Sequence, residues 1–249
     1  MTDVELRGPY ATVRAPGLED EVAVEEPLEI RVDGRPLAVT MRTPGEDEEL
    51  ALGFLYGEGL IDGPRATAPT LEANTVDVQG PLTREPSPRS FYTTSSCGVC
   101  GKGALEEVAV HAPPVPPGPR IARDLLATLP DRLRQPTFAR TGGLHAAGLF
   151  TPAGELLAVR EDVGRHNALD KLIGHALDRV PLHAHIVCVS GRLSFELVQK
   201  AAVAQAPVLV GVGAPSSLAI RLADDRNMTL AGFAREGRVN VYTGTERIS

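Results

Sequence analysis

The stretch HIVCVSGRLSFELVQKAAVAQAPVLVGVGAPSSLAIRLADD, residues 185–225, decides the fold of this chain. It contains two short apolar runs, 186–189 and 207–212, and a small-residue loop and a helix-forming segment follow each. Strands that are apolar on both faces and alternate with helices indicate a parallel sheet covered on both sides. We therefore expect helices over 194–204 and 218–225 and an α/β architecture here.

The flanking segments extend this pattern. A Thr-Pro-Ala-Gly turn joins two runs that favour a hairpin, and a helix with apolar residues at i, i+3 and i+4 follows them. Another helix, with a break at Pro130, precedes the hairpin, and two edge strands are expected near the end. The predicted ranges are helix 123–134, strands 144–150 and 155–162, helix 165–179, and strands 228–234 and 238–244.

The first half of the sequence is richer in β-strand patterns. Two runs within 22–43 flank Asp33-Gly34, which is a strong hairpin signal. A helix then opens in the acidic segment 43–49, and short strands are expected within 71–93. We expect a flexible N-terminus over 1–20, a smaller β-rich domain over 21–111, a proline-rich linker over 112–119 and an α/β domain over 120–249 that binds the ligand. The fold class is thus α/β, or α+β overall.

Composition excludes several classes of function. The 249 residues include 32 acidic and 25 basic residues, a formal net charge of -7, which disfavours nucleic-acid binding. No run approaches 18 uninterrupted apolar residues, so we expect no membrane span, and the first residues do not resemble a secretory signal. Three cysteines argue against a disulfide-stapled secreted protein, so we expect a cytoplasmic one. Cys188 is expected to be a buried small hydrophobe.

Two of the three cysteines, Cys97 and Cys100, form a CxxC in TSSCGVCGKG, residues 94–103. Structural zinc normally takes four ligands, often from two such pairs, and this chain has one pair. His111, His145 or His166 remain possible further ligands. The zinc nucleotide deaminases carry His-x-Glu, which does not occur in this sequence. We therefore expect no metal site.

The CxxC segment suits a mobile sulfur carrier better than a rigid redox turn. Three glycines lie between residues 98 and 103, and glycine leaves a backbone flexible. Lys102 and the start of a following short helix would lower the pKa of a thiol in this segment and favour the thiolate. A thiol–disulfide oxidoreductase and a pair of incidental thiols remain alternatives.

Four further segments combine small and charged residues. The loops 190–194 and 213–217 follow the two apolar strands and suit phosphate binding, although Ser194 and Ser216 also suit plain helix caps. The turn 161–167 groups Asp, Gly, Arg, His and Asn, as either a site or a capped turn. The segment 233–238 places two arginines around a glycine, and its residues alone favour a solvated hairpin. His145 lies in an apolar strand and is expected to be a satisfied core histidine.

Several of these motifs together resemble those of a known family. SSCGVCGKG, TGGLHAAGLF, EDVGRHNALDKLIG, SGRLSFELVQKAA, GAPSSLAIRLA and GFAREGRVNVYTG are similar, in this order, to the formate dehydrogenase accessory sulfurtransferase family, FdhD. The segment EEPLEIRVDGRPLAVTMRTPGEDEELALGFLYGEGLI also resembles it. The resemblance covers nearly the whole chain from about residue 22.

The resemblance implies a sulfur carrier between a cysteine desulfurase and the molybdenum (or tungsten) bis-guanine dinucleotide cofactor, before the cofactor is inserted into apo-formate dehydrogenase. It places the persulfide on Cys97 and an assisting thiol at Cys100. It places a cofactor contact on Phe233, Ala234, Arg235, Glu236, Gly237 and Arg238, which reverses the solvated-hairpin interpretation. It also implies a homodimer and a C-terminal half similar to the cytidine deaminase fold. A cofactor-binding chaperone whose cysteines only dock a partner is the main alternative.

Overall fold

The computed structural model of the chain describes residues 2–86 and 112–249. Its centre is a six-stranded mixed sheet of order β13-β12-β11-β10-β8-β9. The pairs β10–β11 and β11–β12 are parallel, and β8 joins β10 antiparallel, so the expected parallel sheet is confirmed at its centre. The strands are β8 (His145–Phe150), β9 (Leu156–Asp162), β10 (Ile186–Val189), β11 (Val208–Gly211), β12 (Thr229–Arg235) and β13 (Arg238–Thr243).

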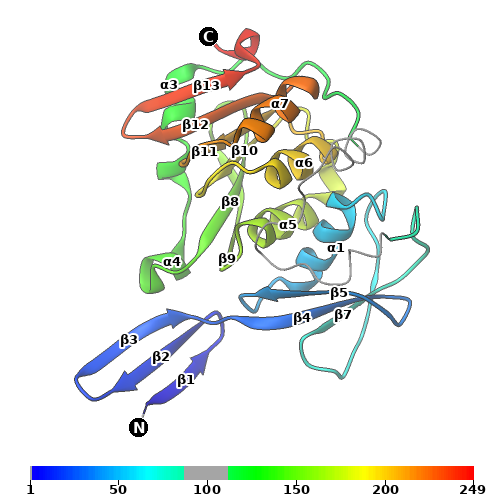
Figure 1. Ribbon diagram of the computed structural model, residues 1–249, viewed down its shortest axis with the longest axis vertical. Helices are drawn as coiled ribbons and strands as arrows, with labels where there is room; N and C mark the ends of the chain where they lie inside the picture. The colour runs from blue at the N-terminus through cyan, green and yellow to red at the C-terminus, as the bar shows by residue number, and fades with distance from the viewer. Residues whose placement is uncertain (1, 87–111) are drawn as a thin grey trace.

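Helices cover both faces of this sheet, because its central strands are apolar on both sides. Val187 and Val189 pack in the cluster of α5, α6 and α7, whereas Ile186 and Cys188 pack in the cluster of α3. Figure 1 shows α5, α6 and α7 on one face and α3 on the other. The helices are α3 (Arg123–Thr128), α5 (Arg165–His175), α6 (Phe195–Val203) and α7 (Ser217–Asp225), and α4 (Pro136–Thr141) precedes β8.

Short 3-10 turns adjoin three of these elements. They are η2 (Pro130–Arg132), η3 (Leu177–Arg179) and η4 (Thr245–Arg247). The first begins at the proline where the helix break was expected. The second, η3, follows α5, which ends at His175. The helix predicted over 165–179 is therefore shorter than expected.

The first half contributes a four-stranded sheet of order β5-β4-β7-β6 and one helix. These elements are β4 (Glu26–Val32), β5 (Arg35–Arg42), α1 (Asp47–Gly57), β6 (Thr67–Ala68) and β7 (Thr75–Val78). The predicted turn joins β4 to β5, with φ of 48° at Asp33 and 76° at Gly34. Both residues are left-handed, as two-residue hairpin turns require.

Helix α1 packs directly on α5 of the other half. A Cβ added at Gly53 would lie 1.8 Å from the carbonyl oxygen of Asp170, and one added at Gly174 would lie 1.9 Å from that of Glu49. Only glycine permits this separation, so the two helix backbones touch. Val115, in the predicted linker, is buried in the core that α5, α6 and α7 form over the six-stranded sheet. It donates its N–H to the carbonyl of Arg226. The domain division at 112–119 stays a prediction.

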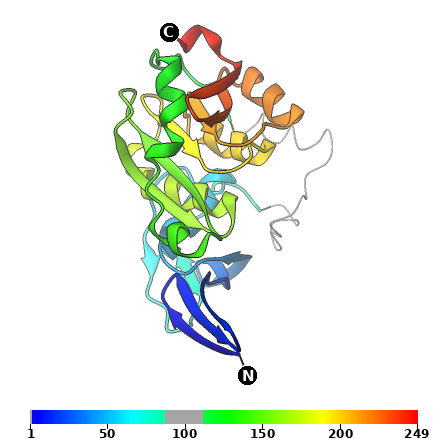
Figure 2. The same cartoon turned by 90° about the vertical axis from the view of Figure 1, so that its left-hand side faces the viewer.

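The N-terminus, which was expected to be flexible over 1–20, contains regular strands. Residues 3–23 form an antiparallel sheet of β1 (Asp3–Arg7), β2 (Tyr10–Ala15) and β3 (Leu18–Ala23). Gly8 and Gly17 take positive φ in its two turns, so the Gly-Pro and Pro-Gly pairs of this segment are turn residues. In Figures 1 and 2 this sheet stands at one end of the molecule, opposite the C-terminus.

Candidate functional site

The candidate site is a cavity of about 300 Å³ at the carboxyl ends of β10 and β11. Open α/β sheets bind ligands at this end of their strands. The cavity is lined by His145, Arg165, Ser190, Gly191, Arg192, Val212, Gly213, Phe233 and Arg235. These residues come from β8, the start of α5, the two loops singled out from the sequence, and the β12–β13 hairpin.

The two loops lie side by side and hold each other in place. The N–H of Gly213 donates to the carbonyl of Gly191 at 3.0 Å, and the N–H of Leu193 donates to that of Ala214 at 3.0 Å. A Cβ at Gly213 would lie only 2.8 Å from Cα of Arg192. Glycine at this position therefore lets the loops approach closely enough to shape one cavity floor.

The helix-cap interpretation of the two serines is confirmed. Ser194 Oγ accepts the N–H of Leu197 at 3.4 Å, and Ser216 Oγ accepts the N–H of Ala219 at 3.2 Å. Neither serine lines the cavity. The polar groups that face a ligand come instead from arginine, histidine and Ser190.

Three arginines line the cavity and form no direct pair with a carboxylate among the described residues. Within residues 2–86 and 112–249, no ion pair or hydrogen bond joins the side chain of Arg165, Arg192 or Arg235 to an acidic residue. No Asp or Glu is among the lining residues, and Nε of Arg165 is buried with no hydrogen-bond partner. A concave site with uncompensated guanidinium groups suits an anion such as a phosphate or diphosphate.

The predicted turn 161–167 divides into structural and cavity-facing residues. Asp162 is fully buried, and its carboxylate accepts the N–H groups of Thr43 and Gly164 and the amide of Asn167. Lys171 Nζ lies 3.0 Å from the same carboxylate. Asp162 therefore holds the turn against the segment after β5. Arg165, three residues further along the chain, reaches the cavity.

The side chain of His166 does not line the cavity. It lies instead in a small polar cluster. Its Nε2 lies 2.7 Å from Glu196 Oε2 and 3.2 Å from Ser194 Oγ. Hydrogen bonding to His166 and, to a lesser degree, the charge of Arg165 lower the pKa of Glu196. Both polar contacts of His166 use one ring nitrogen, so the arrangement is no serine–histidine–carboxylate relay, which needs both.

His145 is not the core histidine expected from the sequence. It is half-buried at the first residue of β8 and lines the cavity. Burial, followed by the charges of Arg165 and His166, lowers its pKa. The apolar run after it is buried, but a strand's first residue lies at the sheet edge, where the loops open the cavity. The sequence signal that could have placed His145 at the cavity is its position at the start of the strand, just after the Gly-Gly pair 142–143.

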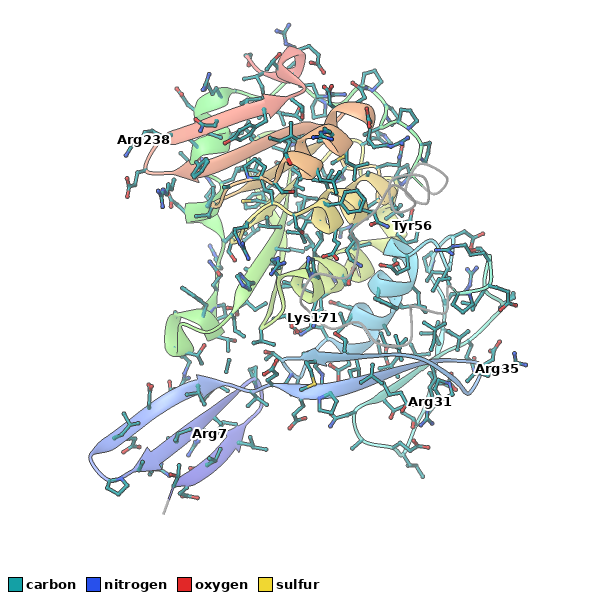
Figure 3. All side chains as sticks on the ribbon, viewed as in Figure 1. Arg7, Arg31, Arg35, Tyr56, Lys171 and Arg238 are labelled. Atoms are coloured by element: carbon teal, nitrogen blue, oxygen red, sulfur yellow. The ribbon has the colours of Figure 1, made fainter. Side chains whose placement is uncertain are left out.

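The six residues 233–238 fall into three groups. Phe233 and Arg235 line the cavity, and Ala234 points into the opposite core and is fully buried. Glu236 and Gly237 form the left-handed turn of an exposed tip, and Arg238 pairs there with Glu236 at 3.2 Å. Figure 3 shows Arg238 pointing away from the body of the protein. The hairpin prediction is confirmed, but its two arginines have different surroundings.

Phe233 reaches the cavity through an unusual backbone conformation. Its φ is 53°, which is rare for a bulky residue, and the pairing of β12 with β13 shifts register between Gly232 and Arg235. Its N–H donates to the carbonyl of Gly213 at 3.2 Å. The bulge thus ties the hairpin to the loop after β11 and turns an aromatic side chain, 39% exposed, to the cavity rim.

A buried ion pair supports the helices behind the site. Lys200 of α6 lies 2.9 Å from Asp170 of α5, and both side chains are buried beneath α1. Burial raises the pKa of Asp170 to about 6 despite this contact. Gly57 of α1 leaves room for the lysine, because a Cβ there would lie 3.2 Å from Cγ of Lys200. The pair joins α5 to α6, and Lys200 Nζ also lies 3.5 Å from Oε1 of Glu58 at the end of α1.

Of the three cysteines, only Cys188 lies among the residues that the structure describes. Cys188 is fully buried in β10, as expected, and burial raises the pKa of its thiol. It therefore cannot act as an exposed thiolate. Cys97 and Cys100 lie outside the described residues. Among the described residues, no helix is long and apolar enough to cross a membrane.

The fold and the cavity together define a mixed α/β protein with an arginine-lined cavity at the carboxyl ends of its central strands. The model of the FdhD/NarQ family matches residues 23–249, so the chain belongs to this family. A relative from Streptomyces coelicolor, named sulfur carrier protein FdhD, is 51% identical over 92% of this chain and 89% of its own length. Relatives of the same name from Mycobacterium bovis and Sulfolobus acidocaldarius are 50% and 45% identical, and each match covers 92% of both chains.

A solved structure shows the same fold. It is a formate dehydrogenase accessory protein from Desulfotalea psychrophila, 27% identical, with a TM-score of 0.78. The match covers 100% of this chain and 98% of that one. The predicted resemblance to the family and the mixed α/β fold class are both confirmed.

Proposed function

We propose that this protein is a sulfur carrier that passes sulfur from a cysteine desulfurase to the bis-guanine dinucleotide form of the molybdenum cofactor, for formate dehydrogenase. The supporting observation is the combination of a CxxC with an anion cavity in one chain. About half of its residues are identical to those of relatives named sulfur carrier proteins. The name of its structural neighbour supports formate dehydrogenase as the recipient.

Cys97 is the proposed carrier. Its thiolate attacks the outer sulfur of the donor's persulfide, so a new S–S bond forms on Cys97 as the donor's S–S bond breaks. The donor cysteine leaves as a thiolate, and no external oxidant is needed. Lys102 beside the CxxC favours the attacking thiolate.

Cys100 is the proposed assisting thiol. Its thiolate attacks Sγ of Cys97, the bond to the outer sulfur breaks, and that sulfur leaves with the electron pair as sulfide. The product is a Cys97–Cys100 disulfide, which a thiol reductant must reduce before the next cycle. The two thiols thereby supply the two electrons that convert persulfide sulfur into sulfide.

The cavity is the proposed place for one nucleotide part of the cofactor, bound as cargo. Arg165, Arg192 and Arg235 suit its diphosphate, and the aromatic face of Phe233 suits stacking against a guanine base. The exposed tip, Glu236 to Arg238, is less suited than the sequence implied, because its charges pair with each other. A homodimer and a cytoplasmic location remain part of this proposal.

Mass spectrometry of the intact protein tests the carrier step. After incubation with a cysteine desulfurase and cysteine, the wild type should gain one sulfur, about 32 Da, by persulfide formation. Cys97→Ala should abolish the gain, whereas Cys100→Ala should retain it and release the sulfur more slowly. Cys188→Ala is the matched control and should behave as wild type, because its thiol is buried.

Other outcomes identify the alternatives. No gain of mass in the wild type contradicts the carrier function and leaves a cofactor-binding chaperone. A reversible loss of two hydrogens with a defined reduction potential, without a gain of sulfur, indicates a thiol–disulfide oxidoreductase.

A further inference from the structure

His145 is a cavity residue to which the proposed function assigns no task. It is the first residue of β8, an interior strand of the six-stranded sheet, and lies opposite Asp162 of the neighbouring strand β9. Its ring lies beside Gly191, where an added Cβ would be 3.3 Å from Nδ1. Glycine thus leaves room next to the imidazole, and the ring forms part of the cavity wall.

Charged and titratable groups surround this histidine. The cations are Arg165 of α5, Arg192 of the loop after β10 and Arg235, which lines the same cavity from the hairpin, and the titratable side chain of His166 also comes from α5. The carboxylate of Asp162, which backbone N–H groups and Lys171 also engage, partly offsets these charges and favours protonation of His145. Before a ligand binds, burial and the neighbouring cations outweigh Asp162 and oppose protonation of His145.

An anion bound in the cavity would reverse the electrostatic effect of the surroundings on the protonation of His145. A diphosphate diester brings two negative charges into the space between the arginines. Those charges oppose the arginines and favour the imidazolium form of a histidine on the same wall. A protonated ring also has a second N–H to donate to a phosphate oxygen, and such charge-assisted bonds are the strong ones.

We propose that His145 takes up one proton as a diphosphate enters the cavity, and so becomes a fourth cationic contact of the bound anion. This inference rests on the proposed function, which places the cofactor's diphosphate in the cavity. Burial and the neighbouring cations lower the pKa of His145 before the diphosphate binds, so the ring begins neutral near pH 7. Binding is then coupled to proton uptake, and affinity rises as the pH falls, at most about tenfold per pH unit for one proton.

Titration calorimetry of the full chain at pH 7 tests this coupling. The probe is diguanosine diphosphate, two guanosines joined by a diphosphate, because its two charges do not change between pH 5 and 9. Binding is measured in two buffers with different enthalpies of ionisation. The difference in heat gives the number of protons taken up with each probe molecule.

Two histidine variants make the result specific. His145→Gln keeps a polar side chain that cannot be protonated, so proton uptake should vanish and affinity should no longer depend on pH. His185→Gln is the matched control, because His185 is also half-buried with a lowered pKa but does not line the cavity. It should retain the wild-type uptake, which should approach one proton.

The outcomes separate this inference from the proposed function. Binding without proton uptake in the wild type, or equal uptake in His145→Gln, would overturn the role of His145 and leave the cofactor site intact. No binding of the probe by the wild type would overturn the placement of the diphosphate, and the inference with it.

Discussion

Two concave regions of this protein each contain three arginines, yet only one of them suits an anion. The cavity beneath the N-terminal sheet, about 490 Å³, is lined by Arg7, Arg14 and Arg140. The smaller cavity at the ends of β10 and β11 has Arg165, Arg192 and Arg235. The number of arginines does not distinguish them, and the larger cavity is the one less suited to an anion.

The difference lies in the carboxylates. In the N-terminal cavity, Arg7 and Arg14 pair with Glu5, Arg14 also pairs with Glu19, and Arg140 pairs with Glu21. In the other cavity, none of the three arginines has such a pair within residues 2–86 and 112–249. Positive charge is available to a ligand only where the protein has not already neutralised it.

Reversing a charge in the uncompensated cavity should have the largest effect. Arg235→Glu or Arg192→Glu removes a charge-assisted contact and adds repulsion, so affinity for diguanosine diphosphate should fall about 100-fold or more in titration calorimetry. Arg238→Glu is the control at the same hairpin and should change affinity less than about threefold, because its side chain is 82% exposed. Unchanged affinity in both cavity variants would disprove the site.

Removing the carboxylates from the N-terminal cavity should have a smaller, opposite effect. The variant Glu5→Gln/Glu19→Gln/Glu21→Gln removes the glutamate partners of Arg7, Arg14 and Arg140, and only the long contact of Arg14 with Asp3, at 4.0 Å, remains among their described ion pairs. A second, weak binding event should then appear in the calorimetry, on the order of 1 mM, because these arginines are exposed to solvent. Binding as tight as in the β10–β11 cavity would show that the enclosure of that cavity contributes nothing.

The smallest effect is expected from loosening the N-terminal sheet itself. Arg140 of α4 holds β3 through Glu21 and lies over the ring of Tyr10, 4.1 Å from its centroid. Arg140→Gln should speed amide hydrogen exchange in residues 3–23 and leave probe affinity unchanged. Arg134→Gln, at an exposed arginine nearby in the sequence, is the control. Slower exchange, or a change of affinity, would contradict a purely anchoring role.

Local patterns in the sequence predicted much of the fold. Apolar runs predicted β10 and β11, and the capping serines and the glycine turn predicted the starts of α6 and α7 and the β4–β5 hairpin. These features depend on residues a few positions apart, so the sequence contains them directly. The N-terminal sheet was missed because its outer strands are mostly exposed and rich in charged residues, which pair across the strands, and so they present no apolar face to a core.

The sequence alone determined the architecture of the α/β half, the family resemblance and the residue types that a sulfur carrier needs. Only the tertiary structure decided which charges remain available. Arg235 and Arg238 stand three residues apart, but a bulge at Phe233 and a tight turn place one at the cavity and the other in solvent. His145 at the start of β8 and Arg165 at the start of α5 line the same cavity, although β9 separates them in the sequence. Charge compensation depends on distances between residues far apart in the chain, which no local pattern encodes.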